Sequence, residues 1–105
     1  MRLHDDKRAV YARFALHTPD LANFLMDPKK SRWAGDPKPE EQIRELTEAI
    51  RLCFAQIRML APARVVAAAG ALLDVALGGK ELTRDRLTAA ELEFEKVARQ
   101  DLRVR

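Results

Sequence analysis

Few side chains in this sequence could take part in chemistry, and their spacing does not bring them together. His4 and His17 are the two histidines, and a metal site needs at least three ligands at close spacing. Asp5 and Asp6 are adjacent, but neighbouring positions on a helix point about 100° apart. We therefore expect no metal site and interpret the two aspartates as acids in a first helical turn, where they suit the helix dipole.

Two further residues could serve as catalytic groups. Cys53 is the only cysteine, so no disulfide can form within the chain. It falls on an apolar helix face with nothing nearby to activate its thiol, which favours a buried small hydrophobe over a nucleophile. Asp74 lies in the most apolar stretch and would need a partner if it were buried. We favour a boundary position that reaches water or a structural ion pair over a catalytic role.

The sequence contains no phosphate-binding loop, nucleophile elbow or acid–base pair. We therefore predict no catalytic residues, no cofactor and a non-enzymatic protein that acts through protein contacts. A basic-aromatic cluster suggests an alternative, a nucleic-acid-binding accessory protein. Its residues are Lys29, Lys30, Arg32 and Trp33. The net charge of +3 is modest, so we favour a solvated loop anchored by Trp33 over one end of the fold.

One set of regularly spaced apolar residues, which we call the seam, is the strongest indication of the fold. Its members are spaced by three or four residues, the pattern of one helix face. They are Ile43, Leu46, Ile50, Cys53, Phe54, Ile57 and Leu60. The pattern predicts a helix from about 39 to 60. Pro62 ends this helix and begins a second, almost wholly apolar one, which stops at Gly78-Gly79.

The remaining segments predict two more helices. The first arm covers residues 2–26 and is kinked or broken at Pro19; because the apolar phase continues across the proline, we favour one arm over two helices. A Pro-rich loop follows at 28–39. The last helix runs from about 83 to 104, with its inner stripe on one face.

Together these elements predict an all-α, antiparallel four-helix bundle. The 105 residues are 48% apolar and 33% charged, which is typical of one folded domain, here residues 1–105. No secretory signal is present, and the longest apolar stretch falls short of the roughly 20 residues that span a bilayer. We expect a soluble, cytoplasmic protein.

Small residues on the third helix suggest a face for self-association, because they let helix backbones approach closely. The candidate face contains Ala67, Gly70, Ala71 and Asp74. Tight packing inside one bundle is the competing interpretation. We expect a homodimer through this face or an unknown protein partner.

Three groups of residues carry a family resemblance. They are Arg8, Ala9, Tyr11, Ala12, Arg13 and Phe14; Ile57, Leu60, Ala61, Pro62, Val65, Val66, Ala68, Ala69, Leu72 and Asp74; and Phe94, Ala98, Arg99, Asp101 and Leu102. With them the chain resembles a family of small all-helical proteins of high-GC actinobacteria, a domain of unknown function. The resemblance implies a helical fold and no particular activity. Separately, Trp33-Ala34-Gly35 is similar to the turn of the small secreted Trp-x-Gly helical proteins, which implies a secreted helical hairpin.

Overall fold

Four helices make up the computed structural model, which describes residues 2–27, 35, 39–78 and 81–103, with residues 2–4 as backbone only. They are α1 (Arg2–Met26), α2 (Pro39–Leu60), α3 (Ala63–Ala76) and α4 (Arg84–Arg103). No strand occurs in the described ranges. The predicted all-α bundle is confirmed, and the helix limits lie within one or two residues of those expected from the prolines and glycines.

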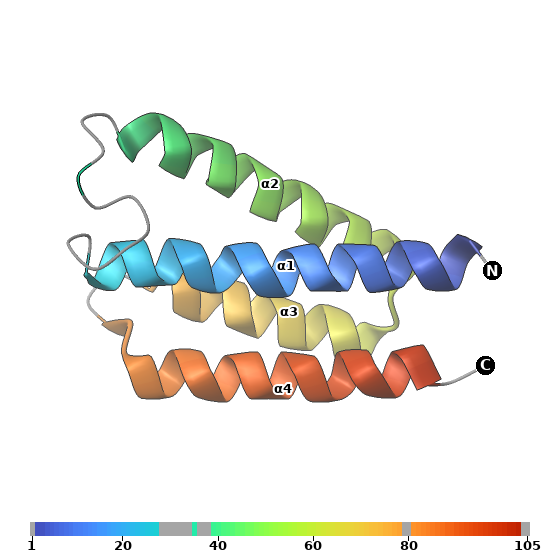
Figure 1. Ribbon diagram of the computed structural model, residues 1–105. Coiled ribbons are helices and arrows are strands. Elements are labelled where there is room, and N and C mark those ends of the chain that lie inside the picture. Colours follow the sequence, from blue (N-terminus) through green and yellow to red (C-terminus); the bar gives the residue numbers. More distant parts are fainter. Residues whose placement is uncertain (1, 28–34, 36–38, 79–80, 104–105) are drawn as a thin grey trace.

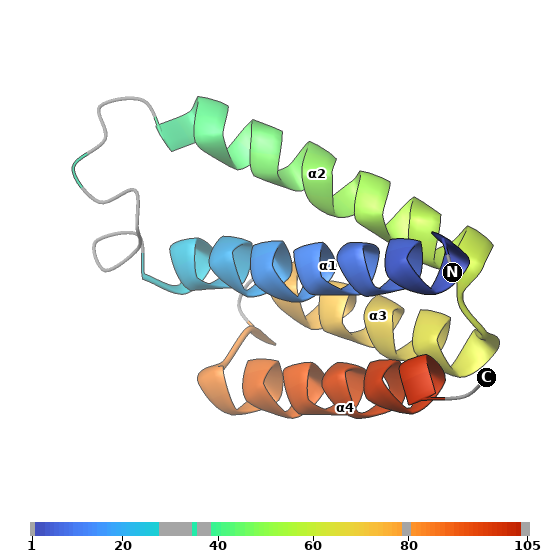
Figure 2. The same cartoon turned by 45° about the vertical axis from the view of Figure 1, so that its right-hand side comes forward.

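Successive helices run in opposite directions, so α1 is antiparallel to α2 and α4 (Figure 1). The beginning of α1 and the end of α4 lie at the end of the bundle that carries the turn between α2 and α3 (Figure 2). Helices α1 and α3 both pack against all three other helices, whereas α2 and α4 lie on opposite outer sides. Toward its N-terminal end, α2 diverges from α1 (Figure 1).

Helix α1 is continuous and includes Pro19, which confirms one arm and not two separate helices. Thr18 therefore lies inside the helix and does not cap a new one. Its side chain is fully buried, and its hydroxyl has no hydrogen-bond partner in the described part of the chain. Buried residues lie at helical spacing on both sides of Pro19, namely Phe14, Leu21 and Ala22. Their packing against the other helices stabilises α1 at the point where proline has no N–H to donate a helical hydrogen bond.

The predicted seam is the inner face of α2. Leu46, Ile50, Cys53 and Ile57 are buried there. Pro62 does not begin the next helix but precedes it, in an extended conformation, and its carbonyl accepts hydrogen bonds from the N–H groups of Val65 and Val66.

At the other end of α3, the Leu77 N–H donates to the Leu73 carbonyl and the Gly78 N–H donates to the Val75 carbonyl. Thr83 then caps α4, because its hydroxyl accepts a hydrogen bond from the Arg86 N–H at 3.2 Å. The prolines and glycine of the sequence thus mark the turns correctly.

A row of aromatic rings fills the centre of the bundle. Phe14 of α1 lies 5.2 Å from Phe94 of α4 and 6.2 Å from Phe54 of α2, measured between ring centroids. Tyr11 contacts Phe94 edge-on at 6.0 Å. These contacts tie α1, α2 and α4 to one another, and α3 closes the core with Val65, Ala69, Leu72 and Ala76.

Candidate functional site

The residues first considered for catalysis are not brought together. Asp5, Asp6 and Asp74 are exposed, His17 is half-buried and Cys53 is buried. Asp74 therefore reaches water, as favoured from the sequence. The side chain of His4 lies outside the described residues. Within the described part of the chain, no three His, Cys, Asp or Glu side chains gather as a metal ion would require.

The four residues of the basic-aromatic cluster, Lys29, Lys30, Arg32 and Trp33, lie outside the described residues. Nucleic-acid binding through this loop therefore stays a prediction.

Only part of the small-residue face of α3 contacts another helix, and the rest is exposed to solvent. Ala67, Ala71 and Asp74 are exposed, whereas Gly70 is half-buried. A Cβ at Gly70 would lie 3.8 Å from the Phe54 ring, so this position adjoins α2. The larger apolar side chains of the same helix face the other three helices. What α3 leaves uncovered is thus small and carries a charge, and it offers little apolar area to a partner.

A buried polar cluster, which sequence reasoning missed, joins α1 to the end of α4. The Tyr11 hydroxyl donates a 2.7 Å hydrogen bond to Asp101 Oδ2, and Lys7 Nζ lies 3.2 Å from the same oxygen. Tyr11 is 4% exposed and Asp101 is 9% exposed. Tyr11 and Asp101 both belong to the groups of residues that carry the family resemblance. The cluster joins residues 90 apart in sequence, so no local spacing reveals it.

The environment of Tyr11 keeps its hydroxyl protonated. Burial raises its pKa well above the ordinary value, and the hydrogen bond to Asp101 and the charge of Asp101 raise it further. The charge of Arg64 lowers this pKa, but to a smaller extent. A phenol with a raised pKa is a poor proton donor in catalysis at neutral pH. The cluster therefore links two helices, and its phenol keeps its proton at neutral pH.

Alkaline pH is expected to break this link. The pKa of Tyr11 is higher in the folded than in the unfolded chain, so its contribution to stability is complete below about pH 10 and is lost as the pH rises through the folded-state pKa. The free energy of unfolding should fall more steeply above pH 10 in the wild type than in Tyr11→Phe. Urea denaturation from neutral to alkaline pH measures both curves, and parallel curves would contradict the assignment.

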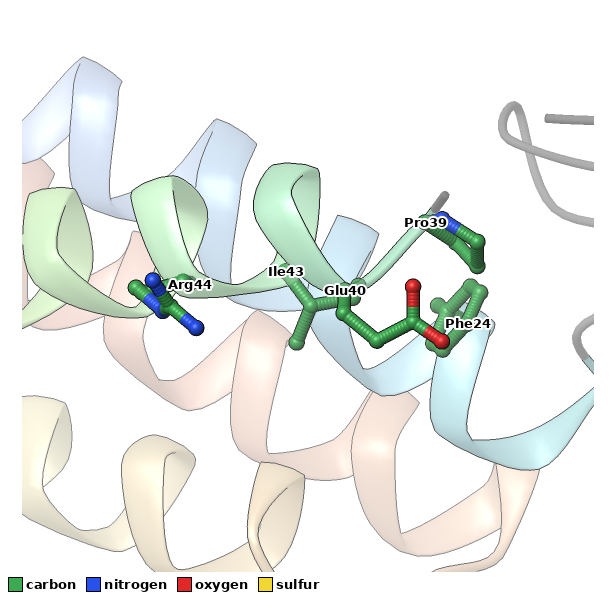
Figure 3. A pocket seen from close by; sticks show the side chains of 5 residues that line it. All are labelled: Phe24, Pro39, Glu40, Ile43 and Arg44. Atoms are coloured by element: carbon green, nitrogen blue, oxygen red, sulfur yellow. The ribbon is translucent and has the colours of Figure 1, made fainter. Parts of the chain in front are cut away.

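A shallow groove opens where α2 diverges from α1 (Figure 3). It has a volume of about 370 Å³ and is lined by Phe24, Pro39, Glu40, Ile43 and Arg44. The Glu40 side chain extends toward Phe24, whereas Arg44 points to the opposite side of Ile43 (Figure 3). The groove can accommodate an apolar side chain, but it contains no nucleophile or acid–base pair.

A second, small cavity of about 30 Å³ lies among Ala15, Leu72, Glu91, Phe94 and Glu95. Burial raises the pKa of Glu91, and the nearby charge of Glu95 raises it further, while Arg84 lowers it. The cavity is about the size of one water molecule. Two carboxylates without a third ligand do not form a metal site.

The outer face of α2 carries an exposed apolar stripe that sequence reasoning also missed. Leu52 is 62% exposed and Met59 is 84% exposed, and Ala55 lies exposed between them. We call these three residues the outer stripe. Their spacing of three and four places them on one face, opposite the buried seam. Other exposed leucines stand singly or at helix ends, namely Leu16, Leu25, Leu77 and Leu92.

Acidic side chains predominate in the first half of α2, and basic side chains replace them in its second half. Between residues 40 and 48 the chain has four acids and one base, whereas residues 49–73 contain three arginines and no acid. The acids are Glu40, Glu41, Glu45 and Glu48, the later arginines are Arg51, Arg58 and Arg64, and all seven side chains are exposed. The outer stripe lies within the basic half of α2, beside Arg51 and Arg58.

No helix in the described part of the chain has both the length and the apolarity needed to cross a bilayer. In comparisons with known proteins, no family model, curated protein or solved structure matches the chain. The resemblance to the actinobacterial helical family and the likeness to the Trp-x-Gly turn therefore stay predictions.

Proposed function

We propose that the protein is a non-enzymatic interaction module that binds another protein molecule through the outer face of α2. One observation carries this proposal: folding leaves Leu52 and Met59 exposed at helical spacing on a helix whose opposite face is already used by the core. Apolar anchors at positions i, i+3 and i+7 are the pattern by which helices dock onto partners. Methionine adds a flexible, polarisable side chain that is enriched at interfaces.

A site-specific cross-link tests this proposal. A photoreactive benzoylphenylalanine placed at Leu52 should give an adduct of higher mass when cells that express the protein are illuminated. The same residue at Leu92 is the matched control, because Leu92 is 60% exposed on α4 and should give none. A folded protein that yields no adduct from position 52, or equal adducts from both positions, would contradict a binding role for this face.

We further propose that the module works in the cytoplasm, in keeping with a single buried thiol and the absence of a disulfide. Fractionation of the producing cells, with the protein detected by an antibody, checks this location.

A further inference from the structure

We propose that the small cavity of about 30 Å³ lined by α1, α3 and α4 binds one structural water molecule. This water replaces a hydrogen bond that α1 loses at Pro19. The residues that line the cavity do not belong to the outer face of α2. The inference therefore goes beyond the proposed function and does not depend on it.

Pro19 deprives one backbone carbonyl of α1 of its usual donor. In an α-helix the N–H of each residue donates to the carbonyl four residues earlier, and proline has no N–H. The carbonyl concerned is that of Ala15, which is half-buried and lines the cavity. Buried backbone carbonyls are generally paired, and a water molecule that inserts into the helical hydrogen bonds is one way to pair them.

A second polar group on the same part of α1 also has no partner. Thr18 is fully buried, and its hydroxyl makes no hydrogen bond to any described residue. Thr18 follows Ala15 by three residues, so the two positions lie on one face of the helix. Its hydroxyl can donate to the oxygen of a water molecule that is bound at the Ala15 carbonyl.

The wall of the cavity on α4 contributes carboxylates. Glu91 and Glu95 both line it, and burial and the charge of Glu95 raise the pKa of Glu91. An ionised carboxylate and a carbonyl are both acceptors, so they cannot bond each other directly. A water molecule has two protons and can donate one to the Ala15 carbonyl and one to a carboxylate. With the Thr18 hydroxyl it makes about three hydrogen bonds, which is typical of buried water.

The size of the cavity limits the ligand to water. A water molecule needs about 10–15 Å³ of such space, and the cavity provides about 30 Å³. Leu72 and Phe94 complete the lining, so apolar side chains meet the carboxylates there. Cavities that stay empty in proteins are apolar throughout, and this one is not.

Nuclear Overhauser effects between water and methyl protons test the site in the wild-type protein. Leu72 is 1% exposed, so a cross-peak from its methyl groups to the water resonance requires a water molecule inside the bundle. Ala69 is the control on the same helix, since it is fully buried and does not line the cavity, and it should give no cross-peak. The absence of a cross-peak at Leu72 would overturn the proposal.

Thr18→Val distinguishes bound water from exchange of the threonine hydroxyl proton with solvent. The variant has no hydroxyl, but the water keeps its bonds to the Ala15 carbonyl and to a carboxylate. The Leu72 cross-peak should therefore persist. Its complete loss would show that the signal came through the hydroxyl, and it would contradict a bound water.

Pro19→Ala tests the role of the proline. The new N–H can donate to the Ala15 carbonyl, so the water loses an acceptor and the Leu72 cross-peak should weaken at least about twofold. Pro39→Ala, at the beginning of α2, is the matched control and should leave the cross-peak unchanged. Ala15→Val should abolish it by filling the cavity, and circular dichroism confirms that each variant is folded. Equal cross-peaks in the wild type and Pro19→Ala would overturn the assignment of the water to the proline.

Discussion

Replacing Phe14 by alanine is expected to lower the free energy of unfolding by about 3–5 kcal/mol. The side chain is fully buried and contacts the rings of Phe54 and Phe94, so its removal leaves a cavity where three helices meet. Small domains are stable by about 5–15 kcal/mol in total. This single change should therefore remove a large part of the stability, as measured by urea denaturation followed by circular dichroism.

Leu16→Ala provides the control on the same helix. Leu16 lies two positions further along α1 and is 60% exposed, so its truncation should change stability by about 0.5 kcal/mol or less. Similar losses for the two variants would mean that the aromatic row is not the centre of the core.

Replacing Asp101 by alanine is expected to cost about 2–4 kcal/mol, because Tyr11 and Lys7 lose their shared acceptor. Asp101 lies in the last turn of α4, which ends at Arg103, and there the helix dipole disfavours a negative charge. Any stability that Asp101 provides must therefore come from its contacts with α1. Urea denaturation measures the loss, and Glu93→Ala, an exposed acid of the same helix, should change little.

A double-mutant cycle with Tyr11→Phe separates the contact from other effects of the substitution. Both changes remove the same hydrogen bond, so the double variant should lose less than the sum of the two single losses. Additive losses would show that the two groups contribute independently, contrary to the geometry.

Helix limits were predictable because they depend on local signals. Proline, glycine and threonine act on helix ends through their local conformation and hydrogen bonding, as Pro62, Gly78 and Thr83 do here. The seam likewise indicates one buried face of α2 by its spacing alone. The continuity of α1 across Pro19 also followed from the local phase of the apolar residues. Which residues of α3 stay exposed did not follow, because that depends on where three other helices lie.

The two features that were missed have different physical causes. Tyr11 and Asp101 could not be paired from the sequence, since their contact depends on the order and direction of all four helices. Leu52 and Met59 were hidden by the stronger pattern of the seam, although both are out of phase with it. A search for apolar residues at helical spacing on the charged side of α2 would have found them.

The contact between Tyr11 and Asp101 also bears on the order in which the bundle can assemble during synthesis. A ribosome releases the chain from its N-terminal end, so α1, α2 and α3 emerge while the acceptor for Tyr11 has not yet been made. The buried face of α1 that α4 covers must wait, exposed to water or to a chaperone, until residue 101 has left the exit tunnel. Closure of this bundle therefore waits for α4, which is the last of its four helices to be made.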